Sequence, residues 1–210
     1  GHIIDREEVI EALQQFPALI FICDEAYFEF CGVTIADLVM QHKNFIVSRS
    51  FSKAFGLAGL RCGYILAHPV ICEQVNKVRV GKNINAVAQV AATAALEDLE
   101  YVQRYVDDVT SAKEWTVKQM ERAGLEVKTT PANFILFKAV EPAKVIKYLE
   151  VHHIYIRDRS YIPELKGLIR LTIGDPLTMK RFWKIFATTP QEWLFGADAV
   201  KMNRWERENG

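Results

Sequence analysis

The stretch SRSFSKAFGLAGLRCGY, residues 48–64, places Lys53 among small hydroxyl residues and ahead of a glycine-punctuated run that contains Arg61. A lysine whose free amine is available can form a Schiff base with a carbonyl compound. Ser50, Ser52 and Arg61 are suited to hold a phosphate, because glycines let the backbone approach a ligand and the guanidinium is a planar charged fork. Taken alone, the pattern fits a solvated surface loop equally well, since Ser-x-x-Lys is short and common.

A carboxylate follows an apolar run upstream of this stretch. Residues 18–23 read ALIFIC and predict a strand that is buried on both faces of a parallel sheet, with Asp24 at its carboxyl end and Tyr27 three residues later. Open α/β sheets bind ligands at that end of their strands. A carboxylate there can keep the pyridine nitrogen of pyridoxal phosphate protonated, and a tyrosine hydroxyl can bond the ring phenolate. Without the lysine, Asp24 would be interpreted as a helix or turn cap.

Three ordered motifs carry a resemblance to a known family. They resemble the fold-type I pyridoxal-phosphate-dependent aminotransferases of class I/II, and within them the histidinol-phosphate aminotransferases, over about residues 1–187: DEAY at 24–27, SFSK at 50–53 and GLRCGY at 59–64. Because the motifs occur in the family's order and at family-like separations, chance does not explain them.

The resemblance assigns a role to each of these side chains. It implies that Lys53 forms the internal aldimine with pyridoxal 5'-phosphate, that Asp24 pairs with the pyridine nitrogen and that Tyr27 contacts the ring oxygen. It also implies that the cofactor phosphate is bound by Ser50, Ser52 and Arg61. The reaction expected from it is a ping-pong transamination between a small amino donor and a keto or phosphorylated acceptor, in a homodimer.

Composition limits the other functions that the chain can have. Of the 210 residues half are apolar, and 26 lysines and arginines balance 26 aspartates and glutamates, so no global charge favours nucleic acid or a membrane. No apolar run approaches the roughly 20 residues of a membrane span, and the amino end has no signal-peptide pattern. The four cysteines lack zinc-site spacing. We therefore expect a soluble cytoplasmic protein without a metal, whose cysteines are reduced and mostly buried.

Strand and helix signals alternate over the first hundred residues, which is typical of an α/β domain. We expect residues 1–105 to be the C-terminal part of the cofactor-binding large domain, with a mainly parallel sheet covered by helices. The elements predicted in it are strands at 18–23, 44–49 and 62–67, and helices at 5–16, 34–42, 69–80 and 84–96. A long helix over 100–123, which Gly124 ends, is expected to link this domain to the next.

Shorter strands follow and predict a small α+β domain over residues 106–188. Its strands are expected at 133–138, 154–157 and 168–173, with one helix opened by Glu141-Pro142 and a last helix over 176–187. The tail, residues 189–210, resembles nothing that we can name. It is interpreted either as a helix that docks on a partner or as a partly disordered segment.

Two arginines of the small domain lie in or just after predicted strands, where an unpaired charge is costly. By resemblance, Arg170 binds the substrate carboxylate, Arg157 helps to hold the phosphate of a phosphorylated substrate, and Asn133 lies near the site. The alternative for Arg157 is a structural ion pair with Asp158 or Asp175.

The chain also departs from the family. Family members have an upstream phosphate loop, an aromatic that stacks on the cofactor and an Asn-Pro-x-Asn-Pro-Thr-Gly run; we expect Gly1 to be the last residue of that run and the chain to begin within a longer protein. Lys82 stands where histidinol-phosphate enzymes usually have an aromatic, which leaves the substrate open. The alternatives are a phosphoamino-acid decarboxylase, an aminotransferase for a small phosphorylated ketone or sugar, and a noncatalytic fragment or dimerisation module.

Overall fold

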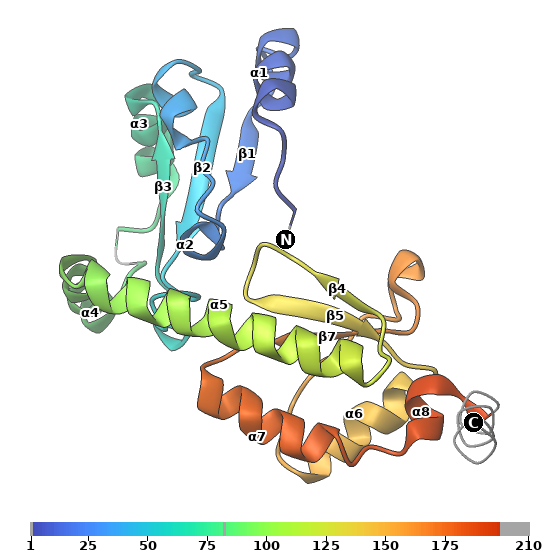
Figure 1. Ribbon diagram of the computed structural model, residues 1–210. Coiled ribbons are helices and arrows are strands. Elements are labelled where there is room, and N and C mark those ends of the chain that lie inside the picture. The colour runs from blue at the N-terminus through green and yellow to red at the C-terminus, as the bar shows by residue number, and fades with distance from the viewer. Residues whose placement is uncertain (1, 82, 198–210) are drawn as a thin grey trace. The chain divides into compact units, whose positions relative to one another are not determined.

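The protein divides into two compact units, Gly1–Val106 and Asp107–Gly210. The computed structural model describes residues 2–81 and 83–197, so that Gly1, Lys82 and residues 198–210, about which the sequence made predictions, lie outside the described residues. Helix α5 (Leu99–Arg122) begins in the first unit and ends in the second (Figure 1).

The first unit is built on a three-stranded sheet of order β1-β2-β3. Strand β1 (Phe21–Asp24) runs parallel to β2 (Phe45–Ser50), and β3 (Gly63–Ala67) runs antiparallel to β2. The helical elements are α1 (Arg6–Gln15), α2 (Phe28–Cys31), the 3-10 helices η1 (Ala36–Met40) and η2 (Ala58–Leu60), α3 (Pro69–Val78) and α4 (Ala86–Glu97). Strands and helices alternate along the chain, which confirms the α/β class.

One face of this sheet forms the core of the unit. Helix α1 begins where the Asp5 side chain accepts hydrogen bonds from the backbone N–H groups of Glu7 and Glu8, at 2.9 and 3.2 Å, as its sequence predicted. The helix then packs Leu13 against the sheet residues Phe45 and Val47, all three almost fully buried. This packing fixes which face of each strand points inward, because side chains alternate along a strand.

Strand β1 differs from its prediction in two ways. The strand begins at Phe21 rather than at residue 18, and Ile22 is 67% exposed although the apolar run predicted burial on both faces. The first difference arises because β2 offers partners only from Phe45 onward. The second arises because α1 and η1 pack on one face only, and no described residue covers Ile22.

The second unit contains a four-stranded antiparallel sheet of order β4-β5-β7-β6. Its strands are β4 (Val127–Thr129), β5 (Phe134–Lys138), β6 (Arg157–Asp158) and β7 (Leu168–Thr172), and its helical elements after α5 are α6 (Pro142–Val151), η3 (Pro163–Leu165), α7 (Pro176–Phe186) and α8 (Gln191–Phe195). Helices α6 and α7 lie on one side of this sheet (Figure 1). There the ring of Phe137 in β5 meets the ring of Phe186 in α7, with centroids 5.4 Å apart.

Two predicted elements of the chain are much shorter in the structure. The strand expected over 154–157 is β6, with only two residues, because it pairs with β7 at Arg170 and Ile169 alone. The helix expected over 34–42 is the five-residue η1. Strand β4 and helix α2 were not predicted, and α8 lies in the tail for which a helix was one of the two interpretations.

The first part of the tail packs on its own unit. In α8 the backbone oxygens of Leu194 and Trp193 accept hydrogen bonds from Val140 N and Glu141 N, at 3.3 and 2.9 Å. The Trp193 ring lies 6.1 Å from that of Tyr148 in α6, and Leu194 is buried. Residues 191–195 therefore form a helix that packs against α6 and bonds to the two residues that precede it.

Two further sequence expectations concern membranes and cysteines. In the described ranges, no helix combines the length and the apolar character that a membrane crossing requires. The cysteines form no disulfide, but each is half-buried rather than buried: Cys23, Cys31, Cys62 and Cys72.

Gly63 provides a test of the β2–β3 pairing. A Cβ atom at this position would lie 2.7 Å from the backbone oxygen of Arg49, so the strands would have to separate. We expect Gly63→Ala to lower the free energy of unfolding by about 1–3 kcal/mol, as overpacking does. Denaturant unfolding measures this change. Gly59→Ala is the matched control, because its Cβ would have open space for 4 Å, and an equal loss in both variants would contradict the prediction.

Candidate active site

Asp24 lies where the sequence placed it, at the carboxyl end of β1. Its register partner in the parallel strand β2 is Ser48, whose hydroxyl donates a hydrogen bond to Asp24 Oδ1 at 3.2 Å. The same oxygen accepts a bond from Ala26 N at 3.1 Å. Within the described chain these bonds use only Oδ1, so the exposed carboxylate retains an oxygen for a ligand.

Lys53 lies in a tight turn that follows β2. Hydrogen bonds from Gly56 N to Lys53 O, 3.0 Å, and from Leu57 N to Phe51 O, 2.9 Å, close the turn, and Gly56 takes the left-handed φ of 70° that the bend requires. The buried side chains of Phe51 and Ala54 anchor the turn on both sides of the lysine. The amine of Lys53 is thereby held 5.3 Å from the ring centroid of Tyr27.

The predicted phosphate-binding residues meet at the end of the β2–β3 hairpin. Ser50 is the register partner of Gly63, and its hydroxyl accepts a hydrogen bond from Ser52 N at 3.0 Å. A bond from Phe51 N to Cys62 O, 3.2 Å, closes the hairpin one residue further, so that Ser52 and Arg61 flank this pair. Arg61 is exposed, has a left-handed φ of 53° and donates to Ala58 O at 3.2 Å.

These side chains fit pyridoxal phosphate by the chemistry of their donor set. Three kinds of group lie at one end of the sheet. They are the amine of Lys53, the carboxylate of Asp24, and the guanidinium of Arg61 together with the hydroxyls of Ser50 and Ser52. They match the aldehyde, the pyridinium nitrogen and the phosphate of the cofactor. The first unit therefore contains every residue that the sequence predicted to contact the cofactor.

The structure adds a buried ion pair beneath the site that sequence reasoning missed. Glu25 is 8% exposed and accepts hydrogen bonds from Arg49 Nε and Nη2, at 3.0 and 2.9 Å, from the Thr34 hydroxyl and from Ile35 N at 2.9 Å. Burial opposes the charge on Arg49, but its hydrogen bonds to Glu25 and Tyr64 outweigh this and raise the pKa of Arg49. The network ties the residue that follows Asp24 to β2 and to the start of η1.

A sequence signal for this pair did exist. Opposite charges lie near the carboxyl ends of two predicted strands, Glu25 just beyond 18–23 and Arg49 at the end of 44–49, and the observed pairing of Asp24 with Ser48 brings them level. The guanidinium carbon of Arg49 also lies 3.7 Å from the ring centroid of Phe28, which closes the pair from water. Predicting this ion pair from the sequence would have required knowing that the two strands lie next to each other and run parallel.

A second missed carboxyl, Glu29, lies two residues after Tyr27. Burial raises the pKa of Glu29, while a backbone hydrogen bond and the charge of Arg49 act in the opposite direction. Its Oε2 is buried and has no hydrogen-bond partner among the described residues. The carboxyl of Glu29 is thus partly shielded from solvent.

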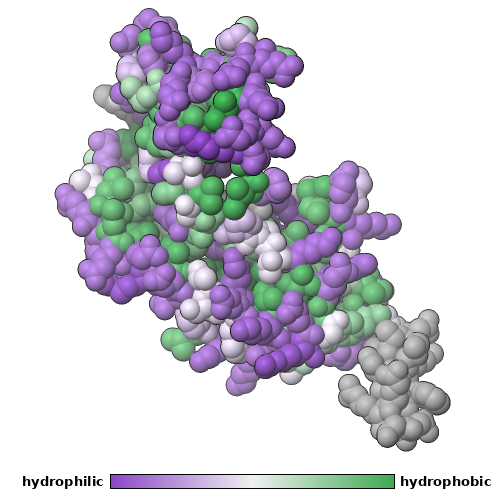
Figure 2. All heavy atoms as spheres, turned by 45° about the horizontal axis from the view of Figure 1, so that its top comes forward, coloured by the Kyte–Doolittle hydropathy of each residue, from purple (hydrophilic) through white to green (hydrophobic). Residues whose placement is uncertain are grey.

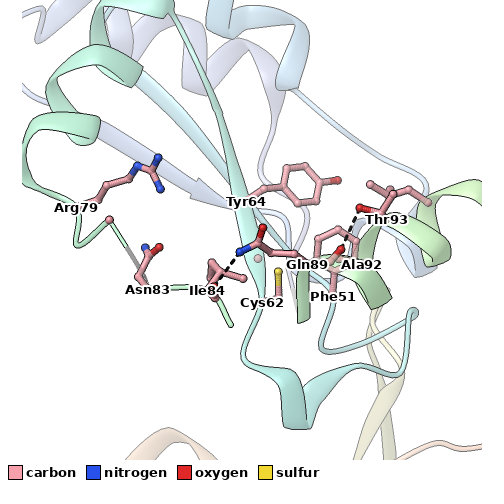
Figure 3. Close-up of a pocket in the computed structure, with 12 residues that line it drawn as sticks. Phe51, Cys62, Tyr64, Arg79, Asn83, Ile84, Gln89, Ala92 and Thr93 are labelled. Carbon is pink, nitrogen blue, oxygen red and sulfur yellow. Dashed lines mark hydrogen bonds between the residues drawn. The ribbon is translucent and has the colours of Figure 1, made fainter. Parts of the chain in front are cut away.

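An open hollow of about 710 Å³ adjoins the lysine turn. Figure 3 shows Phe51, Cys62 and Tyr64 near its centre, and Gln89, Ala92 and Thr93 of α4 across from Arg79 and Asn83. Neither Lys53 nor Asp24 lines the hollow. The hollow was not predicted, because its wall joins β3 to α4, which begins nineteen residues after that strand ends.

The predicted substrate-binding residues all lie in the second unit. Arg170 in β7 and Arg157 in β6 are register partners on adjacent antiparallel strands. The Arg170 guanidinium carbon lies 4.2 Å from the ring centroid of Phe134, and Arg157 is exposed. Asn133 is buried and exchanges backbone and side-chain hydrogen bonds with Ile173, at 2.8 and 3.5 Å. Like charges directly opposite destabilise a sheet, so this arrangement favours a bound anion.

The structural alternative for Arg157 finds no support in the described ranges, where it makes no ion pair with either candidate aspartate. Asp158 accepts a hydrogen bond from Ser160 N at 2.8 Å. Asp175 caps α7 instead, and hydrogen bonds from the backbone and side chain of Thr178 lower the pKa of Asp175. Both carboxylates are therefore engaged locally.

Solved structures share this fold. That of L-threonine-O-3-phosphate decarboxylase from Porphyromonas gingivalis matches with a TM-score of 0.76 and 27% identity, over 90% of this chain and 60% of that one. A histidinol-phosphate aminotransferase from Sinorhizobium meliloti in complex with pyridoxal-5'-phosphate matches with a TM-score of 0.74 and 25% identity, over 88% and 52%. Fold and site thus define the class, an α/β protein with the fold of pyridoxal-phosphate-dependent aminotransferases.

Sequence comparison gives the family. The family model for aminotransferase class I and II matches residues 1–186, and the chain belongs to this family. A dihydroxyacetone phosphate transaminase from Campylobacter jejuni is 40% identical over 75% of this chain and 44% of its own length. A histidinol-phosphate aminotransferase from Thermoanaerobacter pseudethanolicus is 37% identical over 83% and 50%. The chain thus spans about half the length of the curated relatives that it matches.

Proposed function

We propose that the whole protein is a pyridoxal-phosphate-dependent aminotransferase that acts on a phosphorylated or otherwise anionic small substrate by a ping-pong mechanism. The observation that carries the proposal is that Asp24, Lys53 and Arg61 lie at or just beyond the same end of one sheet. The alternative that the chain is only a dimerisation module does not account for this convergence. The bound cofactor would supply the electron sink that the reaction needs.

Each candidate residue of the first unit has its own role in the proposed mechanism. Lys53 would anchor the cofactor, and its amine would take the proton from the donor's α-carbon and later return it. Asp24 would keep the ring nitrogen protonated. Tyr27, whose ring lies near the lysine amine, would contact the ring oxygen. The serines and Arg61 hold the phosphate, which fixes the orientation of the ring.

The second unit recognises the substrate. Arg170 and Arg157, side by side on adjacent strands, bind the carboxylate and the phosphate of the substrate, and Asn133 directly precedes Phe134, whose ring lies 4.2 Å from the guanidinium carbon of Arg170. In this proposal residues 1–105 belong to the large domain and 106–188 to the small domain. The division of the chain into Gly1–Val106 and Asp107–Gly210 supports such a boundary.

The substrate class follows from the anions that these arginines fit. Among the relatives are a histidinol-phosphate aminotransferase and a dihydroxyacetone phosphate transaminase, and both are named for a phosphate ester. A phosphorylated ketone is the second candidate, because the transaminase from Campylobacter jejuni is the more similar of the two relatives described above. The decarboxylase alternative predicts release of carbon dioxide from a phosphoamino acid.

A spectrum and a product screen test this function. Pyridoxal phosphate added to the whole protein should give an absorbance band that borohydride bleaches, and mass mapping should place the reduced adduct on Lys53. Amino transfer to phosphorylated ketones and to the keto partner of histidinol phosphate is then compared with carbon dioxide release from phosphoamino acids. A reduced adduct on another lysine would overturn the proposal.

Arg170 provides a test of substrate recognition. We expect Arg170→Gln to raise KM for the anionic substrate about 30-fold, which corresponds to about 2 kcal/mol for the loss of a charged partner. The cofactor adduct should remain. Arg159→Gln is the control, because its guanidinium donates to the Tyr161 hydroxyl instead. Equal KM values for Arg170→Gln and the parent protein would refute the assignment.

The proposal includes a homodimer in the cytoplasm. Helix α4 has no charged residue from Ala86 to Leu96, yet Val87 and Val90 are 68% and 71% exposed. Figure 2 shows hydrophobic surface on the side of the molecule where Figure 1 places this helix. An apolar helix face of this kind is typical of a protein–protein contact.

Val90 tests the dimer. We expect Val90→Asp to shift the whole protein toward monomer, because a carboxylate in an apolar interface loses its hydration. Analytical ultracentrifugation over a range of concentrations measures the dissociation constant. Val151→Asp is the matched control, since Val151 is exposed to 69% on α6. A Val90 variant that dimerises as tightly as the control would place the interface elsewhere.

A further inference from the structure

A half-buried lysine of the second unit holds a loop. Lys113 lies on α5, and its Nζ donates hydrogen bonds to the backbone oxygens of Thr130 and Ala132, at 2.9 and 3.1 Å. These two carbonyls flank Pro131 in the connection between β4 and β5. Burial lowers the pKa of Lys113, and the charge of Glu114 only partly offsets this.

The connection needs such a partner. Ala132 is 1% exposed, and a buried carbonyl without a hydrogen-bond partner is costly. The loop lies outside the β4–β5 ladder, which ends at the pair Thr129 and Ile135. A second hydrogen bond stabilises the loop: the Thr130 hydroxyl donates to Phe134 O at 2.7 Å. Lys113 thus satisfies two carbonyls at once, which its three donors allow.

The loop leads directly into the proposed substrate-binding residues. Asn133 follows Ala132, and its backbone oxygen accepts a hydrogen bond from Ile173 N at 2.8 Å. Phe134 comes next, and its ring lies beneath the guanidinium of Arg170. A shift of the loop at residues 130–132 would therefore move both Asn133 and the surface on which Arg170 rests.

We propose that Lys113 is a positioning residue that fixes the β4–β5 connection and thereby sets the places of Asn133 and Arg170 for substrate binding. It does not contact the substrate or the cofactor. The inference rests on the proposed function, since it concerns the residues that this function assigns to the substrate. No sequence motif pointed to Lys113, because its partners are backbone atoms of residues seventeen and nineteen positions away.

The test compares three variants of the whole protein. Lys113→Met removes the donors and keeps the apolar stem, Lys113→Arg keeps donors, and Lys118→Met removes an exposed lysine from the same helix. We expect Lys113→Met to raise KM for the anionic substrate about tenfold, because small misplacements of binding groups are costly. Lys113→Arg should recover part of this loss, Lys118→Met should not differ from the parent, and the adduct on Lys53 should form in all three.

Hydrogen exchange gives a second readout that does not depend on activity. Peptides that cover residues 129–135 should exchange faster in Lys113→Met than in the parent protein, and the rest of the sheet should not. If Lys113→Met does not fold, Lys113→Gln, which keeps one donating group, takes its place. A lower melting temperature with unchanged KM would show that Lys113 is only structural and would overturn the proposal, as would unchanged exchange.

Asn133→Ala separates this failure from failure of the proposed function. If Asn133→Ala raises KM and Lys113→Met does not, the positioning role is wrong and the proposed function stands. If the parent protein forms no cofactor adduct and transfers no amino group, the proposed function falls and the positioning role falls with it. Faster exchange together with a raised KM supports both.

Discussion

Replacing Lys53 by alanine in the whole protein is expected to abolish amino transfer, with a loss in kcat of at least about 10⁴-fold, because the proposed mechanism gives this one side chain both the anchoring of the cofactor and the movement of the proton. The turn that holds Lys53 is closed by backbone bonds and by the buried side chains of Phe51 and Ala54, none of which involve the lysine amine. The variant should therefore fold as the parent does. Steady-state amino transfer and mapping of the borohydride-reduced adduct measure the result.

Lys43→Ala is the control for this experiment, because Lys43 is an exposed lysine of the same unit. It should keep both activity and the adduct. Lys53→Arg adds a second comparison, since it retains a positive charge next to Tyr27 but cannot form the imine. Substantial turnover in either Lys53 variant would remove the lysine from the mechanism.

Replacing Glu25 by alanine is expected to give the largest loss of stability, about 3–5 kcal/mol, because it leaves the buried guanidinium of Arg49 without its carboxylate. The two side chains are only 7% and 13% exposed and share two hydrogen bonds. The hydroxyl of Thr34 and Ile35 N lose their acceptor as well. Denaturant unfolding followed by circular dichroism measures the change in the free energy of unfolding.

The exposed pair between Arg6 and Asp37 is the matched control. It also joins a guanidinium to a carboxylate by two hydrogen bonds, but the side chains are 41% and 57% exposed. Water screens such pairs, so Asp37→Ala should change the stability little. If both variants lost the same amount, burial would not be what makes the Glu25 pair important.

Helix ends were predictable because their signals are local. Asp5 starts α1, Pro69 starts α3 and Gly124, with its left-handed φ of 86°, ends α5. Each of these residues acts on backbone groups within a few positions of itself. The spacing of residue types along the chain is then enough to place the boundary.

Strand ends were not predictable in the same way. The apolar run at 18–23 gave no sign that pairing begins at Phe21, because that depends on where β2 begins. The predicted strand at 154–157 became two residues because β7 offers it only Arg170 and Ile169. A strand is defined by a partner that lies far away in the sequence.

The sequence by itself determined the chemical character of the candidate site: an amine at Lys53, a carboxylate at Asp24 and a cation at Arg61, in the order typical of the family. The tertiary structure alone decided that Glu25 pairs with Arg49, that Arg157 lies opposite Arg170 and that Lys113 holds the loop before Asn133. The physical reason is the distance along the chain over which each interaction acts. Residue type and short spacing are properties of the chain, whereas register, burial and long-range hydrogen bonds exist only once distant segments have packed together.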